Sequence, residues 1–207
     1  AVVVDADLTD AHAVKLTGVN ASGAMTGLAN GAVQLNWLSL GPLADSTDGG
    51  QGSQSWSFSA PDSYFDYLAD GEAVTLTYTI EVDDHHGGVT SQDIVVTVNG
   101  SNDAPDIADI AQQGLVEQAD AAPLTTTISV AFTDLDLTDV GHSATISGGV
   151  ATGTITGLAL DEAALIALVT PGAVSKAAGS SAGSVDLSFS AASTAFQSFS
   201  RSTNSGG

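Results

Sequence analysis

Apolar and polar residues alternate along the stretch Val74-Thr75-Leu76-Thr77-Tyr78-Thr79-Ile80-Glu81-Val82, with an apolar residue at every second position. This period of two is typical of a β-strand with one buried and one solvated face. A polar, glycine-rich connection follows over residues 83–88, and the alternation resumes with Ile94, Val96 and Val98. The pattern therefore predicts a β-hairpin.

Outside this hairpin, most of the regular structure is also predicted to be strand. The segments with strand composition are separated by loops rich in glycine, serine and aspartate, and they are residues 12–19, 54–59, 125–132, 142–147 and 184–190. Residues 161–168 alone predict a helix, because acidic residues occupy the first turn and Pro171-Gly172 would end it. The sequence thus predicts an all-β protein.

The chain contains two copies of one unit. Asp5-Ala6-Asp7-Leu8-Thr9-Asp10 returns as Asp134-Leu135-Asp136-Leu137-Thr138-Asp139, and Trp56-Ser57-Phe58-Ser59-Ala60 returns as Leu187-Ser188-Phe189-Ser190-Ala191. The first pair is 129 residues apart and the second 131, which is the size of a domain. Turn-forming residues crowd at 99–106, where Pro105 favours an extended backbone at the residue before it. We therefore predict two domains, residues 1–103 and 104–207.

Composition restricts the class of protein. Of 207 residues, 43% are hydrophobic, too many for a disordered acidic tail. The 24 acidic residues outnumber the 3 basic ones and give a formal net charge of −21. We therefore expect binding neither to nucleic acid nor to an anionic membrane, because both require cationic contacts. The absence of cysteine excludes disulfides and thiolate metal sites. No run of about 20 apolar residues predicts a membrane helix.

The feature that recurs in both copies is a cluster of oxygen donors. Carboxylates are the ligands that calcium prefers, and six to eight oxygens surround the ion. Two carboxylates in Asp-x-Asp spacing at a strand end, such as Asp134 and Asp136, can point towards one ion. The sequence therefore predicts bound Ca²⁺. The alternative, in which these side chains only cap turns, stays open.

Several motifs in order resemble one known family. They are the closing strand and linker Val98-Asn99-Gly100-Ser101-Asn102-Asp103-Ala104-Pro105, the stretch Phe65-Asp66-Tyr67-Leu68-Ala69-Asp70-Gly71-Glu72, Leu115-Val116-Glu117, and Phe132-Thr133-Asp134-Leu135-Asp136. This set resembles the VCBS-type, cadherin-like repeats of bacterial RTX adhesins. The resemblance covers nearly all of the first unit and the first half of the second. The first unit lacks the counterpart of residues 114–127, and the second lacks that of residues 74–98.

The resemblance implies tandem Ig-like (cadherin-like) Greek-key β-sandwiches joined by a short calcium-binding linker. It further implies that linker and Asp-x-Asp residues share ions with acids of adjoining turns. The candidate calcium ligands are Asp5, Asp7, Asp10, Asp70, Glu72, Asp83, Asp84, Asn102, Asp103, Glu117, Asp134, Asp136 and Asp139.

Other residues are open to functional interpretations that the sequence favours less. His85-His86 suggests zinc, but no third ligand is near in sequence, so we expect a solvated turn. His12 and His142 either pack in strands or orient a ligating carboxylate. Trp56 is expected in the core, while Trp37 is a weak candidate for stacking on a sugar. No catalytic motif is present, so we do not expect an enzyme.

Together these patterns predict a structural repeat of a large secreted or surface-attached bacterial adhesin, acting as a calcium-stiffened extender in cell adhesion or biofilm. Its partners would be adjacent repeats or copies of itself, and any secretion signal would lie outside these residues. The alternatives are a self-associating filament or surface-layer subunit and a polysaccharide-binding module. Because both units look incomplete, we expect a strand from outside the chain beside residues 184–190 or near residues 1–4.

Overall fold

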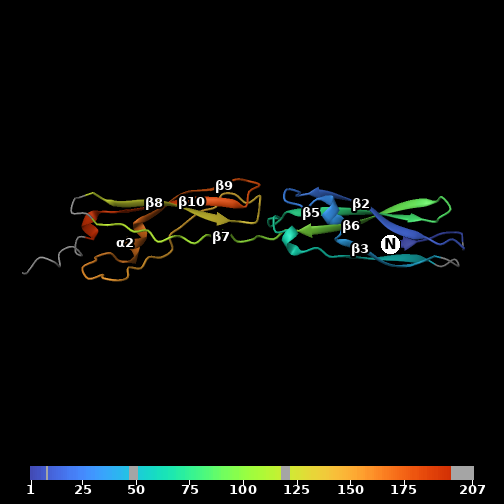
Figure 1. Ribbon diagram of the computed structural model, residues 1–207, viewed down its shortest axis with the longest axis horizontal. Coiled ribbons are helices and arrows are strands. Elements are labelled where there is room, and N and C mark those ends of the chain that lie inside the picture. The colour runs from blue at the N-terminus through green and yellow to red at the C-terminus, as the bar shows by residue number, and fades with distance from the viewer. Residues whose placement is uncertain (8, 47–50, 118–121, 197–207) are drawn as a thin grey trace, which may run out of the picture. The chain divides into compact units, whose positions relative to one another are not determined.

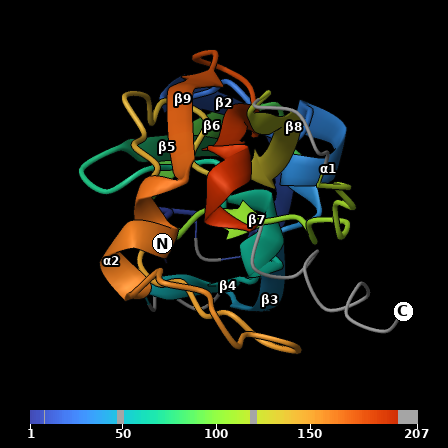
Figure 2. The same cartoon turned by 90° about the vertical axis from the view of Figure 1, so that its left-hand side faces the viewer.

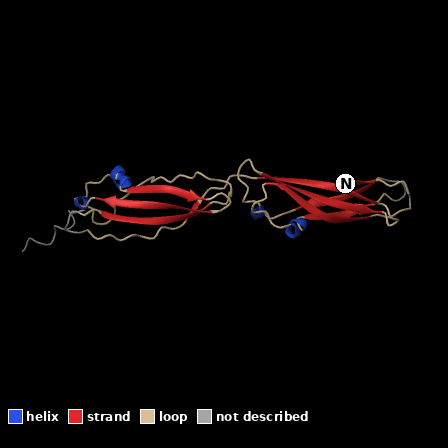
Figure 3. Ribbon diagram, turned by 90° about the horizontal axis from the view of Figure 1, so that it is seen from above, coloured by secondary structure: helices blue, strands red, loops and turns tan. Residues whose placement is uncertain are grey.

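The computed structural model describes residues 1–7, 9–46, 51–117 and 122–196. The chain divides into two compact units. Unit 1 comprises Ala1–Asp103 together with the short segment Leu135–Thr138, and unit 2 comprises Ala104–Asp134 and Asp139–Gly207. In both units strands account for most of the regular structure and the helices are short (Figure 3). The protein is therefore all-β, as the alternating pattern predicts.

Unit 1 is built from two three-stranded antiparallel sheets (Figure 1). One sheet has the order β1-β4-β3 and the other the order β2-β5-β6. The strands are β1 (Val2–Val3), β2 (Ala13–Gly23), β3 (Leu38–Ala44), β4 (Gly52–Phe58), β5 (Ala73–Asp83) and β6 (Val89–Asn99). The helix α1 (Gly31–Leu35) and the 3₁₀ turn η2 (Asp62–Tyr64) connect them. β5 and β6 pair from Ala73 opposite Asn99 to Asp83 opposite Val89, which confirms the predicted hairpin.

The core of unit 1 lies between these two sheets. Every second residue of β5 is buried, and Val74, Leu76, Tyr78 and Ile80 are completely inaccessible. They belong to one apolar cluster with side chains of the other sheet such as Leu38. The Tyr78 hydroxyl donates to the Gln34 carbonyl oxygen at 2.9 Å, and burial raises the pKa of Tyr78 to about 12. Unit 1 is thus a sandwich-like pair of sheets with β5 at its centre.

The two tryptophans lie in environments opposite to those expected. Trp37 is only 4% exposed and packs against Phe65 with 5.3 Å between ring centroids, so it forms core and offers no stacking surface. Trp56 is 43% exposed, and the expectation that it anchors the core is wrong. The reason is that β1 pairs only with Gly52 and Ser53 of β4, so within the described residues no strand flanks Trp56 on that edge.

Unit 2 contains a single four-stranded antiparallel sheet of order β7-β8-β10-β9. Its strands are β7 (Asp106–Ile107), β8 (Leu124–Thr133), β9 (Val169–Lys176) and β10 (Ala182–Ala191). The predicted helix is confirmed as α2 (Glu162–Ala167), whose N-cap Asp161 accepts from the Ala164 amide at 2.8 Å, and α2 leads directly into β9 (Figure 2). The 3₁₀ turn η3 (Ser193–Ala195) follows β10.

The two units share local geometry as well as sequence. α1, β3, β4 and η2 occur in the same order as α2, β9, β10 and η3. Gly23 and Gly27 have φ angles of +93° and +99°, and Gly153 and Gly157 adopt +87° and +89° at the matching positions. This left-handed backbone suits glycine, which has no Cβ to clash. The repeat thus extends to individual turns.

Three sequence-based expectations need correction. Residues 142–147 form no strand. The strands β3 and β9 and the helix α1 were not predicted, because Gly41-Pro42 and Pro171-Gly172 interrupt the two strands at bulges and α1 has only five residues. Finally, β10 is flanked by β8 and β9, so an outside strand cannot pair beside residues 184–190. Pairing near residues 1–4 stays a prediction. Among the described residues no helix is long and apolar enough to cross a membrane.

Candidate metal centre

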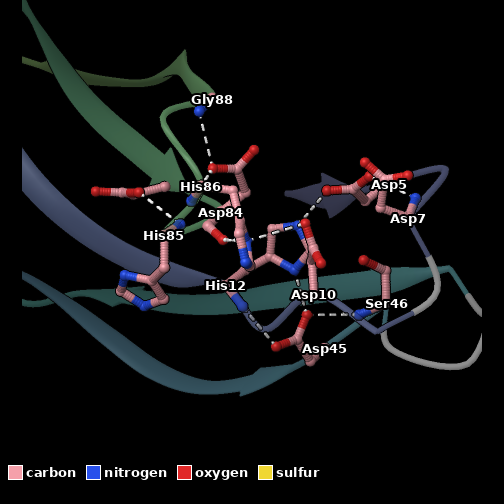
Figure 4. Close-up of polar contacts among 11 residues, drawn as sticks. Asp5, Asp7, Asp10, His12, Asp45, Ser46, Asp84, His85, His86 and Gly88 are labelled. Atoms are coloured by element: carbon pink, nitrogen blue, oxygen red, sulfur yellow. Dashed lines mark hydrogen bonds and ion pairs between the residues drawn. The ribbon is translucent and has the colours of Figure 1, made fainter.

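Three carboxylates of unit 1 lie close together. Oxygens of Asp5, Asp10 and Asp84 all lie within 4.8 Å of one another (Figure 4). Asp5 and Asp10 belong to the segment between β1 and β2, and Asp84 follows β5. Because Ala13 of β2 pairs with Asp83 of β5, the antiparallel register brings the residues just before β2 beside the start of the β5–β6 turn. The sheet therefore assembles a cluster from residues that are far apart in sequence.

The β5–β6 turn holds Asp84 through backbone hydrogen bonds. One oxygen, Oδ1, accepts from the amides of His86 at 2.7 Å and Gly88 at 2.8 Å. These two amides lower the pKa of Asp84 below its ordinary value, because hydrogen bonds to a carboxylate favour its charged form. Asp84 is thus a turn cap, as the alternative interpretation of the acidic residues predicts, and its carboxylate also belongs to the cluster that could hold an ion.

The His12 imidazole lies between the carboxylates of Asp45 and Asp5, and Asp5 is a member of the cluster. Its Nδ1 is 2.6 Å from Asp45 Oδ1, its Nε2 is 2.9 Å from Asp5 Oδ2, and its side chain is only 4% exposed. The hydrogen bonds to Asp45 and then Asp5 raise the pKa of His12. The pKa of Asp5 is lowered, first by the Asp7 amide and then by His12. His12 was expected either to pack in a strand or to orient a carboxylate. The structure shows its imidazole in contact with two carboxylates.

Asp45 belongs to the same arrangement, although the sequence did not single it out as a ligand. It accepts from the His12 amide at 2.8 Å and from the Ser46 amide at 2.7 Å, and the His12 amide is the first cause of the lowered pKa of Asp45. The Ser46 hydroxyl is buried with no hydrogen-bond partner in the described part of the chain. The only sequence signal was the acidic, glycine-rich loop at residues 45–50.

His86 contacts the cluster from the solvent side. Its side chain is 68% exposed, in agreement with the expected solvated turn, yet Nδ1 lies 3.2 Å from Asp10 Oδ2. The same Nδ1 is 2.9 Å from the Asp84 carbonyl oxygen. That carbonyl, and then the charge of Asp10, raise the pKa of His86. His86 therefore places a titratable group beside the three carboxylates.

The donor set fits a hard divalent cation. Carboxylate oxygens suit Ca²⁺ and Mg²⁺, and three such groups supply half or fewer of the six to eight oxygens that Ca²⁺ takes, so backbone oxygens or water would complete the shell. The lowered pKa values of Asp5 and Asp84 keep both groups ionised at neutral pH. Within the described residues this is the one group of three or more acidic or histidine side chains close enough to share an ion.

The second copy of the motif has a different arrangement. Asp134 is 2% exposed and lies 2.5 Å from His142 Nε2, which repeats the contact of Asp5 with His12. With the offset of 131 residues, however, Lys176 stands where unit 1 has Asp45, and its Nζ donates to the Asp139 carbonyl oxygen at 2.7 Å. His142 Nδ1 is accordingly buried with no hydrogen-bond partner among the described residues. An ammonium group thus replaces a carboxylate in this copy.

Asp136 is completely buried but takes part in unit 1. Its Oδ2 accepts from the Asp103 amide at 2.8 Å, and both residues belong to that unit. Asp134 belongs to unit 2. The predicted Asp-x-Asp pair is therefore divided between the two units, and the second carboxylate holds the backbone at the end of residues 1–103.

The remaining predicted ligands lie outside the three-carboxylate cluster. Asp7 and Asp70 are exposed. Glu72 accepts from the Ala69 amide at 3.0 Å and Asp83 from the His85 amide at 2.8 Å, so both cap turns. The Asn102 side chain donates to the neighbouring Asp103 carbonyl at 3.1 Å. Glu117 lines an apolar hollow in unit 2, while Asp139 is half-buried.

Comparison with known proteins gives no family assignment. No protein-family model and no curated protein matches this chain.

Proposed function

We propose that this chain is a calcium-stabilised structural repeat of a large secreted or surface-attached bacterial adhesin, with tandem Ig-like, cadherin-like Greek-key sandwiches of the VCBS type. The observation that supports it best is the cluster of Asp5, Asp10 and Asp84. Those three carboxylates come from two segments that are distant in sequence, so a shared cation would link them. The excess of 24 acidic over 3 basic residues fits the same proposal.

The cluster would act through the chain segments that it connects. Bound Ca²⁺ would supply positive charge and oxygen coordination at the three carboxylates. Asp5 is held by His12, which is itself held by Asp45 at the end of β3. Asp84 is held by the turn between β5 and β6. These residues therefore tie one sheet of unit 1 to the other at this end of the sandwich, and a ligand that binds only the folded state stabilises it.

This role suits a protein outside the cell. Extracellular calcium modules bind with dissociation constants of about 10⁻⁴–10⁻³ M, where the ion is plentiful. A repeat that stiffens at such concentrations would serve as an extender that holds a distal binding domain away from the surface. Carboxylates that repel one another without the ion would become a rigid connection with it.

Calorimetric titration with Ca²⁺ tests the proposal, together with thermal unfolding in Ca²⁺ and in chelator. We expect Asp84→Asn to weaken calcium affinity by about tenfold or more, because even residues that only orient a metal ligand contribute on this scale. Asp62→Asn is the matched control, since Asp62 is exposed and lies outside the cluster. Equal behaviour of the two variants, or a melting temperature indifferent to millimolar Ca²⁺, would refute a calcium role for this cluster.

A further inference from the structure

Four residues from the second copy of the repeat are part of unit 1. Leu135–Thr138 belong to unit 1, whereas the residues on either side of them in sequence belong to unit 2. Exposure differs sharply within this segment, because Leu135 is 48% exposed while Asp136 is completely buried and Leu137 is half-buried. The segment therefore places one carboxylate and one apolar side chain inside unit 1.

Leu137 packs against the core of unit 1 beside a glycine. Its side chain packs on the apolar cluster that includes Tyr67 and the buried residues of β5. A Cβ placed on Gly27 would lie only 3.1 Å from Leu137 Cδ1 and 2.8 Å from the Tyr67 ring, so both side chains lie directly against the Gly27 backbone. Gly27 also adopts a φ of +99°, which suits glycine. A larger residue at this position would compete with Leu137 for space.

The residue that receives Leu137 is held by hydrogen bonds within unit 1. The Tyr67 hydroxyl donates to the Ala24 carbonyl oxygen at 2.8 Å, and the Ala24 amide donates at 2.9 Å to the carbonyl oxygen of Ala73, the first residue of β5. Tyr67 is 9% exposed, and its carbonyl oxygen accepts from the Leu137 amide at 3.3 Å. The position of Tyr67 is thus tied to the sheet that contains β5.

Asp136 makes a second contact next to that of Leu137. Its Oδ2 accepts from the Asp103 amide at 2.8 Å, and Asp103 is the last residue of the continuous part of unit 1. Adjacent residues therefore make an apolar contact and a hydrogen bond to a carboxylate, which is stronger than one between neutral groups. The same pair occurs as Asp7-Leu8 in the first copy, so it belongs to the recurring motif.

We propose that unit 1 has a docking site, made of Gly27, Tyr67 and the Asp103 amide, that binds the Asp-Leu pair of the following copy of the repeat. The partner is a chain segment with a carboxylate followed by a branched apolar side chain. Hydrogen bonds at Asp103 and Tyr67 fix its register, and Gly27 leaves room for the leucine. The stability of unit 1 then includes a contribution from residues of the second copy, as contacts between neighbouring copies contribute in other repeat proteins. The inference does not depend on calcium.

Native-state hydrogen exchange in the full chain tests this docking. Leu137→Ala should speed exchange of the most protected amides of β5 by about tenfold or more, because the packing of a leucine is lost. Amides of β8 and β10 in unit 2 should keep their rates. Leu135→Ala is the matched control, since Leu135 is 48% exposed, and it should change neither set. Unchanged rates in β5 for Leu137→Ala, faster exchange confined to β8 and β10, or an equal effect of the two variants would overturn the proposal.

A second measurement asks whether the two contacts act together, as docking of one segment requires. Asp136→Ala removes the acceptor of the Asp103 amide and should also speed exchange at the Leu137 amide by about tenfold or more. Leu137→Ala should likewise speed exchange at the Asp103 amide, whereas Leu137→Met keeps the apolar volume and should preserve protection there. Thr138→Ala, at an exposed position, is the control. Protection of either amide that persists after the other contact is removed would show two unrelated contacts and overturn the proposal.

Discussion

At the scale of single residues, the arrangement around His12 depends on charge. Its imidazole is hydrogen-bonded to Asp45 and Asp5 and its side chain is only 4% exposed, so these two carboxylates favour the charged imidazolium. The counterpart His142 has one carboxylate partner, Asp134, and Lys176 in place of the other. Two equivalent histidines thus differ through one substitution that is distant in sequence.

The raised pKa of His12 predicts a pH dependence of stability in chelator. A raised folded-state pKa gives stability that is full below the unfolded value, about 6.5, and is lost as the pH rises through the folded value. The lowered pKa values of Asp5 and Asp45 give stability that is present above about 3.8 and lost as the pH falls. His12→Gln should therefore lower the free energy of unfolding at pH 5.5, by about 1–3 kcal/mol, and less at pH 8.5.

Urea unfolding at both pH values checks this expectation. His85→Gln is the control, because His85 is exposed in the solvated turn and only its backbone amide bonds Asp83. An equal loss for His12→Gln at pH 5.5 and pH 8.5 would contradict the charged state inferred for His12.

Asp136 offers a second prediction at this scale. Its buried Oδ2 accepts from the Asp103 amide, and an asparagine would keep an acceptor of the same shape. Asp136→Ala leaves that amide without its acceptor and should destabilise unit 1 by about 1–3 kcal/mol, more than Asp136→Asn does. Denaturant unfolding in chelator compares the variants, and a similar loss for both would show that charge, not hydrogen bonding, is what matters at this position.

At the scale of elements, equivalent segments take different structures in the two units. β2 pairs along its length with β5, whereas residues 143–153, which occupy the matching place in the second copy of the repeat, form no strand among the described residues. The glycine turns that follow both segments keep their positive φ angles. Turn geometry is therefore local, while strand formation depends on a neighbour.

Substitutions at Gly71 and Gly27 allow the cost of a left-handed backbone to be measured apart from the cost of steric crowding. Gly71 has φ +83° and open space around its missing Cβ, while Gly27 has φ +99° and a Cβ there would lie 2.8 Å from the Tyr67 ring. Gly71→Ala should cost about 1–2 kcal/mol from the left-handed backbone alone. Gly27→Ala should cost a further 1–3 kcal/mol or so for overpacking. Thermal unfolding measures both, and equal losses would mean that Tyr67 moves aside freely.

At the scale of the whole molecule, the large negative net charge governs how stability responds to ions. A formal charge of −21 over 207 residues makes the folded state repel itself, and only 3 basic residues offset it. Ions act on this repulsion in two ways, by general screening and by binding at specific carboxylates. Screening and specific binding act at different ion concentrations, so measurements at several concentrations separate them.

In chelator, raising NaCl from about 0.02 M to 0.5 M should increase the melting temperature, because the Debye length then falls well below 10 Å. Millimolar Ca²⁺ should add a further increase at 0.5 M NaCl if the ion is bound at the cluster, and Asp84→Asn should remove that increment only. A calcium effect that disappears at high salt would indicate screening without a site.

The sequence by itself determined the features that depend on neighbouring residues. Strict alternation predicts β5 and β6, acidic residues and a proline predict α2, and the recurrent Asp motif reveals the repeat. These patterns are readable because strand and helix periods and turn residues act within a few positions. The sequence also indicates Asp5, Asp10 and Asp84 as candidate ligands, because they lie in segments rich in acidic residues.

Only the tertiary structure decided which of those acids meet. The register of β2 with β5 brings Asp84 to Asp5 and Asp10, and the end of β3 brings Asp45 to His12. Asp136 is taken into unit 1 while Asp134 remains in unit 2. Pairing across tens of residues is set by the choice of partner strand, and that choice is a property of the whole sheet, which no local period encodes.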